Sequence, residues 1–138
     1  MGARILVFIK RNPALTPEGF RHMYETGHSR LAVRLFGHLW SSYKRHYLGS
    51  ANSFADVKGA PVGATSPDQV EGGYDVITEL VFKDERAMEE NNRILAENRA
   101  IIEEDEERTF DRAACWLVMC DTVEEDLSQA PGRWPLQD

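Results

Sequence analysis

Cysteine is scarce in this sequence, and its scarcity indicates whether the chain carries disulfide bonds and in which cellular compartment it works. Only Cys115 and Cys120 are present. They are five positions apart in an expected strand, where side chains alternate between faces, so we expect them to point apart and not to pair. Without a disulfide framework, the sequence favours a reduced, cytoplasmic protein.

Other absences exclude further classes of protein. No apolar run approaches the roughly 18 residues of a membrane span, and residues 1–10 are too short and too soon interrupted for a signal peptide. The net charge of -7 argues against a nucleic-acid partner, because phosphate binding needs a basic face. No Cys/His cluster with metal spacing, glycine-rich phosphate loop or GxSxG motif is present. We therefore expect no metal and no tightly bound cofactor.

What is present fits one domain with a core. The chain has 138 residues, of which 42% are hydrophobic. β-rich runs predict strands at residues 4–10, 40–48, 74–82 and 114–120. Helices are expected from the Thr16 cap to about Gly37, and from the Asp84 cap to about Ile102. The acidic run 103–107 is interpreted as a solvated helix end or turn. Residues 49–73 form a long loop or lid, and residues 121–138 form a tail after a domain of residues 1–120.

The order of these elements predicts an α+β fold. The pattern β-α-β-β-α-β is ferredoxin-like, with a four-stranded antiparallel sheet and two helices on one face. The strands are apolar on both faces, whereas the helices cover only one. We therefore expect a homodimer in which two sheets pack face to face.

The first helix carries a histidine on its apolar stripe. His28 recurs at helical spacing with Phe20, Met23, Tyr24, Gly27, Leu31 and Leu35. An imidazole among apolar groups suits a general acid/base, because histidine ordinarily titrates near neutral pH. The alternative is a core histidine that is hydrogen-bonded to a backbone carbonyl.

Four stretches of the chain resemble the EthD-domain family: FIKRNPALTPEGFRHMYETGH, RHYL, YDVITELVF and IIEEDEERTFDR. The resemblance runs from about residue 5 to residue 117. The resemblance implies a dimeric α+β barrel, and the RHYL-like strand is most similar to fungal members that act without a cofactor in aromatic polyketide pathways. The family's helix histidine matches His28, although Arg30 stands where the family often has proline. The family's tyrosine–aspartate pair matches Tyr74 and Asp75, and its acidic cluster matches Asp105 and Asp111.

The other candidate site residues have two interpretations each. Tyr24 lies one turn before His28 and would orient its ring or polarise a carbonyl, or it is a core tyrosine. His46 either faces the cavity or lies at a surface or dimer interface, because alternation alone does not fix its face. Asp75 would hold a histidine ring, or it is a strand-end carboxylate. Candidate walls of an aromatic-binding pocket are Phe20, Trp40, Tyr43 and Tyr74.

The residues and the resemblance together predict a cofactor-independent lyase. It would be a decarboxylase or dehydratase/cyclase that acts on a hydrophobic aromatic polyketide intermediate of secondary metabolism, with His28 as general acid/base and Tyr24, His46 and Asp75 as its partners. The alternatives are a cofactor-free monooxygenase that oxidises an anthrone-like phenol, and a non-catalytic dimeric binding or accessory protein.

Overall fold

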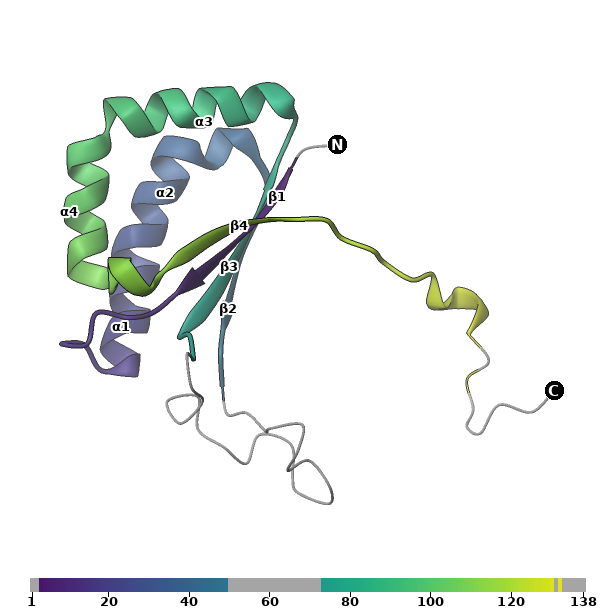
Figure 1. Ribbon diagram of the computed structural model, residues 1–138, viewed down its shortest axis with the longest axis horizontal. Helices are drawn as coiled ribbons and strands as arrows, with labels where there is room; N and C mark the ends of the chain where they lie inside the picture. The colour runs from purple at the N-terminus through teal and green to yellow at the C-terminus, as the bar shows by residue number, and fades with distance from the viewer. Residues whose placement is uncertain (1–2, 50–72, 131, 133–138) are drawn as a thin grey trace, which may run out of the picture.

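The computed structural model describes residues 3–49, 73–130 and 132, and contains one antiparallel sheet (Figure 1). The strands are β1 (Arg4–Ile9), β2 (Trp40–Tyr47), β3 (Val76–Phe82) and β4 (Trp116–Cys120). Their order is β2-β3-β1-β4, so β1 and β3 are central and β2 and β4 are edges. The predicted ferredoxin-like α+β fold is confirmed, with each β-rich run forming its strand.

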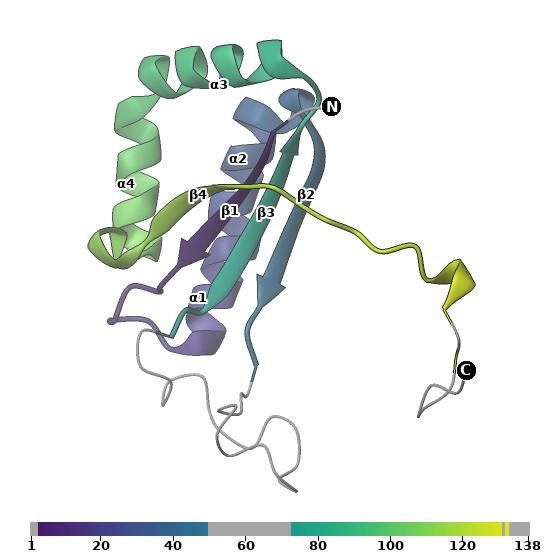
Figure 2. The same ribbon diagram turned by 45° about the vertical axis from the view of Figure 1, so that its right-hand side comes forward.

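The first helical segment begins where its capping residues predict. The Thr16 hydroxyl accepts a hydrogen bond from the Gly19 amide at 3.0 Å, and Pro17 occupies the first turn. The segment comprises α1 (Pro17–Met23), a π-helical turn (Tyr24–His28), α2 (Ser29–Phe36) and a 3₁₀ turn (Gly37–Leu39). It packs along one face of the sheet (Figures 1 and 2).

The second helical segment corrects one expectation. Asp84 caps it as predicted, and α3 (Glu85–Glu97) is followed at Asn98 by α4 (Arg99–Thr109). The acidic run 103–107 is therefore not a helix end or turn: it lies inside α4. The two helices meet at a sharp corner (Figure 2). The Asn98 side chain donates to the Ile94 carbonyl at 2.9 Å, which caps the end of α3.

Two apolar clusters form the core between the helices and the sheet. The first joins α2 and α3 to the sheet through Ile5, Phe36, Leu39, Phe82, Ala87 and Ile94. The second joins α1, the π-turn and the end of α4 to it through Ile9, Phe20, Tyr24, Val76 and Phe110. The helical layer is thus fixed to the sheet at both ends, and the space between the clusters is where a site can form.

Strand register assigns every strand side chain to a face. Ile5 pairs with Leu80 and Met119, so these residues share the helix-covered face. Phe8 pairs with Ile77 and Trp116 on the opposite face, which no described helix covers. Cys115 and Cys120 are both unpaired, as expected. After β4, residues 121–130 extend away from the sheet and are exposed (Figures 1 and 2).

Candidate functional site

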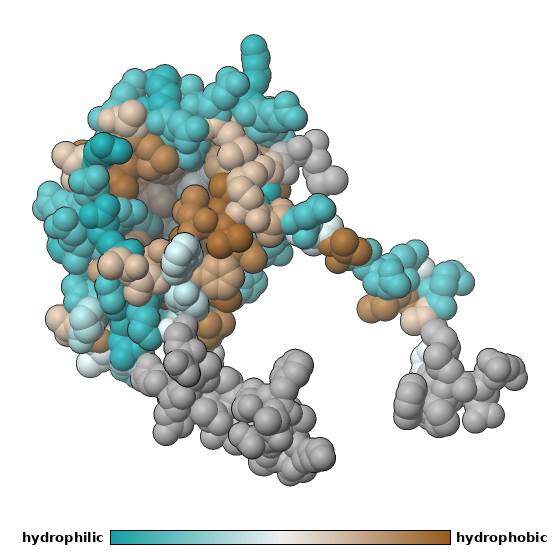
Figure 3. All heavy atoms as spheres, in the orientation of Figure 1, coloured by the Kyte–Doolittle hydropathy of each residue, from teal (hydrophilic) through white to brown (hydrophobic). Residues whose placement is uncertain are grey.

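A cavity of about 180 Å³ lies between the two core clusters and opens beside β4. Figure 3 shows this hollow bordered by apolar side chains between the corner of α3 and α4 and the exposed β4. Its walls come from all layers of the fold: Ile5, Val7, Tyr24, His28, Leu31, Leu35, Trp40, Tyr43, Thr78, Leu80, Leu95, Ile102, Glu106, Phe110 and Leu117 among others. We call it the central cavity. A concave apolar space with few polar groups is the usual form of a small-molecule site.

The π-turn brings two of these residues to the cavity. The Ser29 amide donates to the Tyr24 carbonyl five residues earlier, so this turn is one residue wider than an α-helical turn. Tyr24 and His28 therefore contact edge to face, with ring centroids 5.1 Å apart. Widened turns of this kind are frequent at functional sites, because they re-aim side chains without ending the helix.

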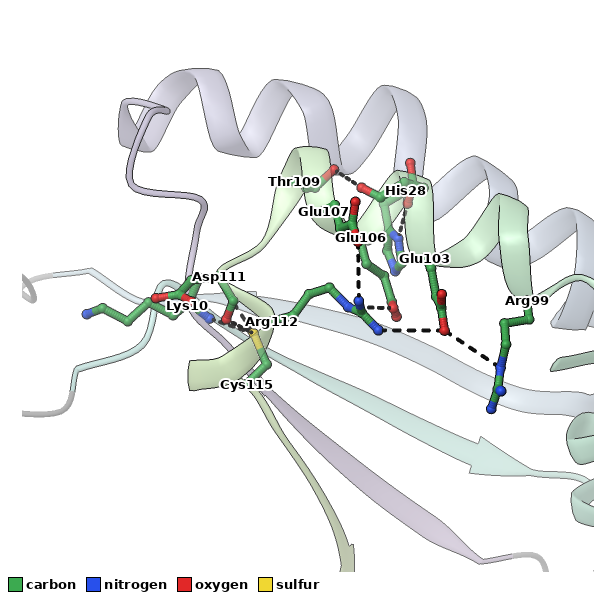
Figure 4. A network of polar contacts seen from close by, with 11 residues as sticks. Lys10, His28, Arg99, Glu103, Glu106, Glu107, Thr109, Asp111, Arg112 and Cys115 are labelled. Carbon is green, nitrogen blue, oxygen red and sulfur yellow. Dashed lines mark hydrogen bonds and ion pairs between the residues drawn. The ribbon is translucent and has the colours of Figure 1, made fainter. Parts of the chain in front are cut away.

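His28 is held by a carboxylate from the other helical segment. Its Nδ1 is hydrogen-bonded to Asp105 of α4, which is 5% exposed (Figure 4). The Phe110 ring packs against the imidazole, with ring centroids 4.7 Å apart. With Nδ1–H donating to the carboxylate, Nε2 carries the free lone pair, which is the tautomer that a general base needs. The pairing also fixes the orientation of the ring in the cavity wall.

Tyr24 is a wall residue whose hydroxyl is already engaged. The hydroxyls of Tyr24 and Thr78 are hydrogen-bonded at 2.6 Å, and Tyr24 is 1% exposed. Burial raises the pKa of Tyr24 far above its ordinary value. The phenol therefore stays protonated, and its contribution is to pack against His28.

Two further groups of the wall are buried without a partner. Within the part of the chain that the structure describes, the Trp40 indole N–H and the Tyr43 hydroxyl have no hydrogen bond. Burial raises the pKa of Tyr43, so its hydroxyl keeps its proton. An unpartnered buried polar group costs about 1–3 kcal/mol, which an acceptor on a bound molecule would offset.

Comparison with known proteins identifies the family of the chain. The family model of the EthD domain matches residues 12–113, which is most of the chain. This protein belongs to the EthD-domain family. The solved structures that it resembles include the crystal structure of At3g17210 from Arabidopsis thaliana, with 12% identity, a TM-score of 0.54, and 91% of this chain and 99% of that chain covered.

A solution structure of the same hypothetical Arabidopsis thaliana protein gives 15% identity and a TM-score of 0.50 over 91% of this chain and 92% of that one. At these identities the likeness shows the fold alone. No match is found among curated proteins.

The central cavity does not include every residue that the sequence suggested. His28, Tyr24, Trp40 and Tyr43 line the central cavity together. Phe20 lies behind Tyr24, at 5.8 Å between ring centroids, and is buried in the second core cluster. It supports the cavity wall without being part of it.

His46, Asp75 and Tyr74 lie away from the cavity. His46 is on the uncovered face of the sheet, where its Nε2 lies 3.2 Å from Glu79. Asp75 binds the backbone and guanidinium of Arg11, at 2.8 and 2.6 Å, and so connects the start of β3 to the end of β1 instead of holding a histidine ring. The Tyr74 ring packs against Phe8, with ring centroids 5.4 Å apart, and does not line the cavity.

A second polar cluster fixes β2 against the π-turn. Arg45 donates two hydrogen bonds to Glu25, at 2.8 and 2.6 Å, and the Tyr47 hydroxyl donates to the same carboxylate. These donors lower the pKa of Glu25 to about 2. Because Arg45 and Tyr47 come from the strand that also carries Tyr43, this cluster sets the distance between β2 and the helix that carries His28.

The sequence did not indicate that Glu106 lines a cavity. Asp105 matched the acidic cluster of the family, but nothing in the sequence paired it with His28. The acidic run looked like a solvated surface because its charges are continuous. The spacing of three cavity residues could have indicated this face. These residues recur every four positions, as on one helix face: Ile102 and Glu106 in α4 and Phe110 at its C-cap. Within the described residues, no group of three or more His, Cys, Asp or Glu is arranged to hold a metal ion, and no helix could cross a membrane.

Proposed function

We propose that this protein is a cofactor-independent lyase, a decarboxylase or dehydratase/cyclase, that acts on an aromatic polyketide intermediate in secondary metabolism. One observation carries the proposal: His28 lines an apolar cavity with its Nδ1 engaged by Asp105, which leaves Nε2 for a substrate. Loss of water or carbon dioxide from an activated ketone needs only positioned proton transfers and hydrogen bonds to a developing oxyanion.

The walls of the cavity support the class of substrate. Trp40 and Tyr43 present aromatic surface, and each holds a buried donor that has no acceptor within the described residues. A planar ring system fits aromatic walls, and its carbonyl or hydroxyl oxygens would accept from these donors. The proposed substrate is therefore an aromatic or nearly aromatic ketone that carries oxygen substituents.

We also propose that the protein works as a homodimer. The second copy would cover the open face of the sheet, where Trp116 and Val118 of β4 are 63% and 41% exposed. Leu6, Phe8, Ile77 and Val81 continue this apolar surface across the central strands. Glu79 and His46 interrupt this surface on β3 and β2, but the part around Leu6, Phe8 and Trp116 is apolar. Solvated sheets normally carry polar residues on their open face, so this exposed apolar part favours a partner sheet.

The test is a mass-spectrometric time course with two bicyclic probes. A β-hydroxytetralone becomes naphthol when it loses water, and a tetralone β-keto acid becomes tetralone when it loses carbon dioxide. We expect the wild type to accelerate one of these losses, and His28→Ala to reduce turnover by about 10²–10⁴-fold. His22→Ala is the matched control, because His22 is exposed on α1. Thermal melting checks that both variants fold.

Other outcomes identify the rival functions. Oxygen consumption with an anthrone, measured with an electrode, would replace the lyase with a monooxygenase. Probe binding without any mass change would replace it with a binding protein. Full activity in His28→Ala would remove His28 from the mechanism.

A further inference from the structure

The central cavity contains a second ionisable side chain, contributed by α4. Glu106 follows Asp105 directly, and both it and His28 line the cavity. Figure 4 shows its side chain beside the His28 ring and directed towards Arg112. Asp105 is hydrogen-bonded to the imidazole of His28, whereas Glu106 accepts no hydrogen bond from it. Two neighbouring carboxylates of one helix therefore have different surroundings.

Arg112, from the 3₁₀ turn Arg112–Ala114, is shared by three carboxylates of α4. Its guanidinium lies 3.4 Å from Glu106, 3.6 Å from Glu107 and 4.0 Å from Glu103. Arg99 also lies 3.6 Å from Glu103, so two guanidiniums face three carboxylates. The excess negative charge disfavours ionisation of all three carboxylates together.

Solvent exposure distinguishes Glu106 from the other two carboxylates. The side chain of Glu106 is 30% exposed, against 45% for Glu103 and 69% for Glu107. The least solvated carboxylate loses most on ionising. Accordingly, burial raises the pKa of Glu106, with Asp105 and Glu103 adding to the rise and Arg112 and His28 opposing it.

The charge of the cavity also restricts its ligand. Among the described residues that line it, none is lysine or arginine, and the ionisable acid and base are Glu106 and His28. A substrate carboxylate would enter an apolar space that already holds Glu106. The guanidinium beside Glu106, that of Arg112, already faces three carboxylates of α4. Burying an unpaired charge is costly, so the cavity favours a neutral ligand.

From these observations we infer that Glu106 is a catalytic residue, the general acid that works with His28 as general base, and that the reaction is the loss of water from a neutral β-hydroxy ketone. This inference rests on the proposed lyase function and selects dehydration over decarboxylation.

The elimination balances with these two groups. Nε2 of His28 takes the proton from the carbon next to the carbonyl, and the electron pair of that C–H bond forms the new C=C bond. The C–O bond to the β-hydroxyl breaks, and the Glu106 carboxyl gives its proton to the departing oxygen, which leaves as water. His28 is then protonated and Glu106 ionised; transfer of one proton from the imidazolium to the carboxylate, through water, restores both.

The first test uses the two tetralone probes on the full-length protein. We expect the wild type to convert the β-hydroxytetralone to naphthol and not to accelerate loss of carbon dioxide from the β-keto acid. Glu106→Gln keeps the shape but cannot give up a proton in this way, and should reduce naphthol formation by about 10²–10⁴-fold. Glu107→Gln is the matched control, because Glu107 also contacts Arg112 but does not line the cavity. We expect it to behave as the wild type.

The second test uses pH and separates a proton donor from a structural side chain. If the protonated carboxyl is the active form, kcat/KM falls on the alkaline side as Glu106 ionises. Arg112 favours the ionised carboxylate, so Arg112→Gln raises the pKa of Glu106. The alkaline limb should therefore move to higher pH in Arg112→Gln, and this limb should be absent in the residual activity of Glu106→Gln.

Each result has one meaning. If the wild type converts neither probe, the lyase function falls, and this inference with it. If His28→Ala is inactive but Glu106→Gln forms naphthol at the wild-type rate, only the role of Glu106 falls. If carbon dioxide is lost and water is not, the lyase stands and the choice of dehydration is overturned.

Discussion

Each side of the sheet has a histidine paired with a carboxylate, yet the pairs differ in almost every other respect. The His28 side chain is 17% exposed, and its partner Asp105 comes from the other helical segment. The His46 side chain is 53% exposed, and its partner Glu79 lies on the adjacent strand. A histidine–carboxylate pair is therefore held in a cavity wall on one side of the sheet and solvated on the other. Burial and the origin of the partner make the difference.

The largest expected effect tests whether the two faces contribute differently to folding. Phe82 is 2% exposed on the helix-covered face, so Phe82→Ala should lower the free energy of unfolding by about 3–5 kcal/mol. Trp116 on the open face is 63% exposed, so Trp116→Ala should change the stability of one protomer by no more than about 0.5 kcal/mol. Urea denaturation measures both.

The same tryptophan variant tests the proposed second copy. Sedimentation equilibrium should show weaker self-association for Trp116→Ala than for the wild type, because the apolar surface between two sheets is reduced. Association equal to that of the wild type would mean that no second copy sits on this part of the face.

A smaller effect is expected for the ion pair between Glu25 and Arg45, which links the π-turn to β2. The pKa of Glu25 is about 2 in the folded chain, below its ordinary 4.5, so its stabilising effect is complete above pH 4.5 and is lost as pH falls towards 2. Glu25→Gln should lower the free energy of unfolding by about 1–2 kcal/mol at pH 7, at the low end because the side chain is 35% exposed.

Denaturation across pH supplies the check on this ion pair. The difference between wild type and Glu25→Gln should shrink as pH falls below 4.5. Glu104→Gln on the exposed side of α4 should show no such dependence. A difference that is constant with pH would assign the loss in Glu25→Gln to packing instead of charge.

The smallest expected effect sharpens the contrast between the histidines. His46→Gln should leave turnover of the tetralone probes unchanged and alter stability by no more than about 0.5 kcal/mol, because the side chain is exposed and lies across the sheet from the cavity. A turnover loss as large as that of His28→Ala would mean that the uncovered face, closed by a second copy, takes part in the site.

Local sequence signals were enough for the fold. The Thr16 and Asp84 caps and the β-rich runs are short-range features, and each begins the element that it predicts. The site depends on information that is not local. His28 and Asp105 are 77 positions apart, so no spacing rule connects them. The sequence could not decide which face of the sheet carries His46. Alternation fixes which residues share a face, but not which face the helices cover.

The break between α3 and α4 explains why the acidic run was misread. At Asn98 the chain changes direction without proline or glycine, the residues that usually signal such a change. The helix then continues at a new angle, and this angle turns Asp105 and Glu106 inwards. The sequence pattern ended the helix at about Ile102, before Asp105 and Glu106, and so assigned these two residues to solvent.

The widened turn at Tyr24–His28 holds one residue more than an α-helical turn, yet the helix on each side of it faces the core. Phe20 on one side of the turn and Phe36 on the other are each buried in a different core cluster. Loss of one residue together with the widening would leave both phenylalanines facing almost as they do now, because the wider turn takes up the rotation of about 100° that an extra residue adds to an α-helix. A deletion within this turn should therefore spare the two clusters and change only the cavity wall between them.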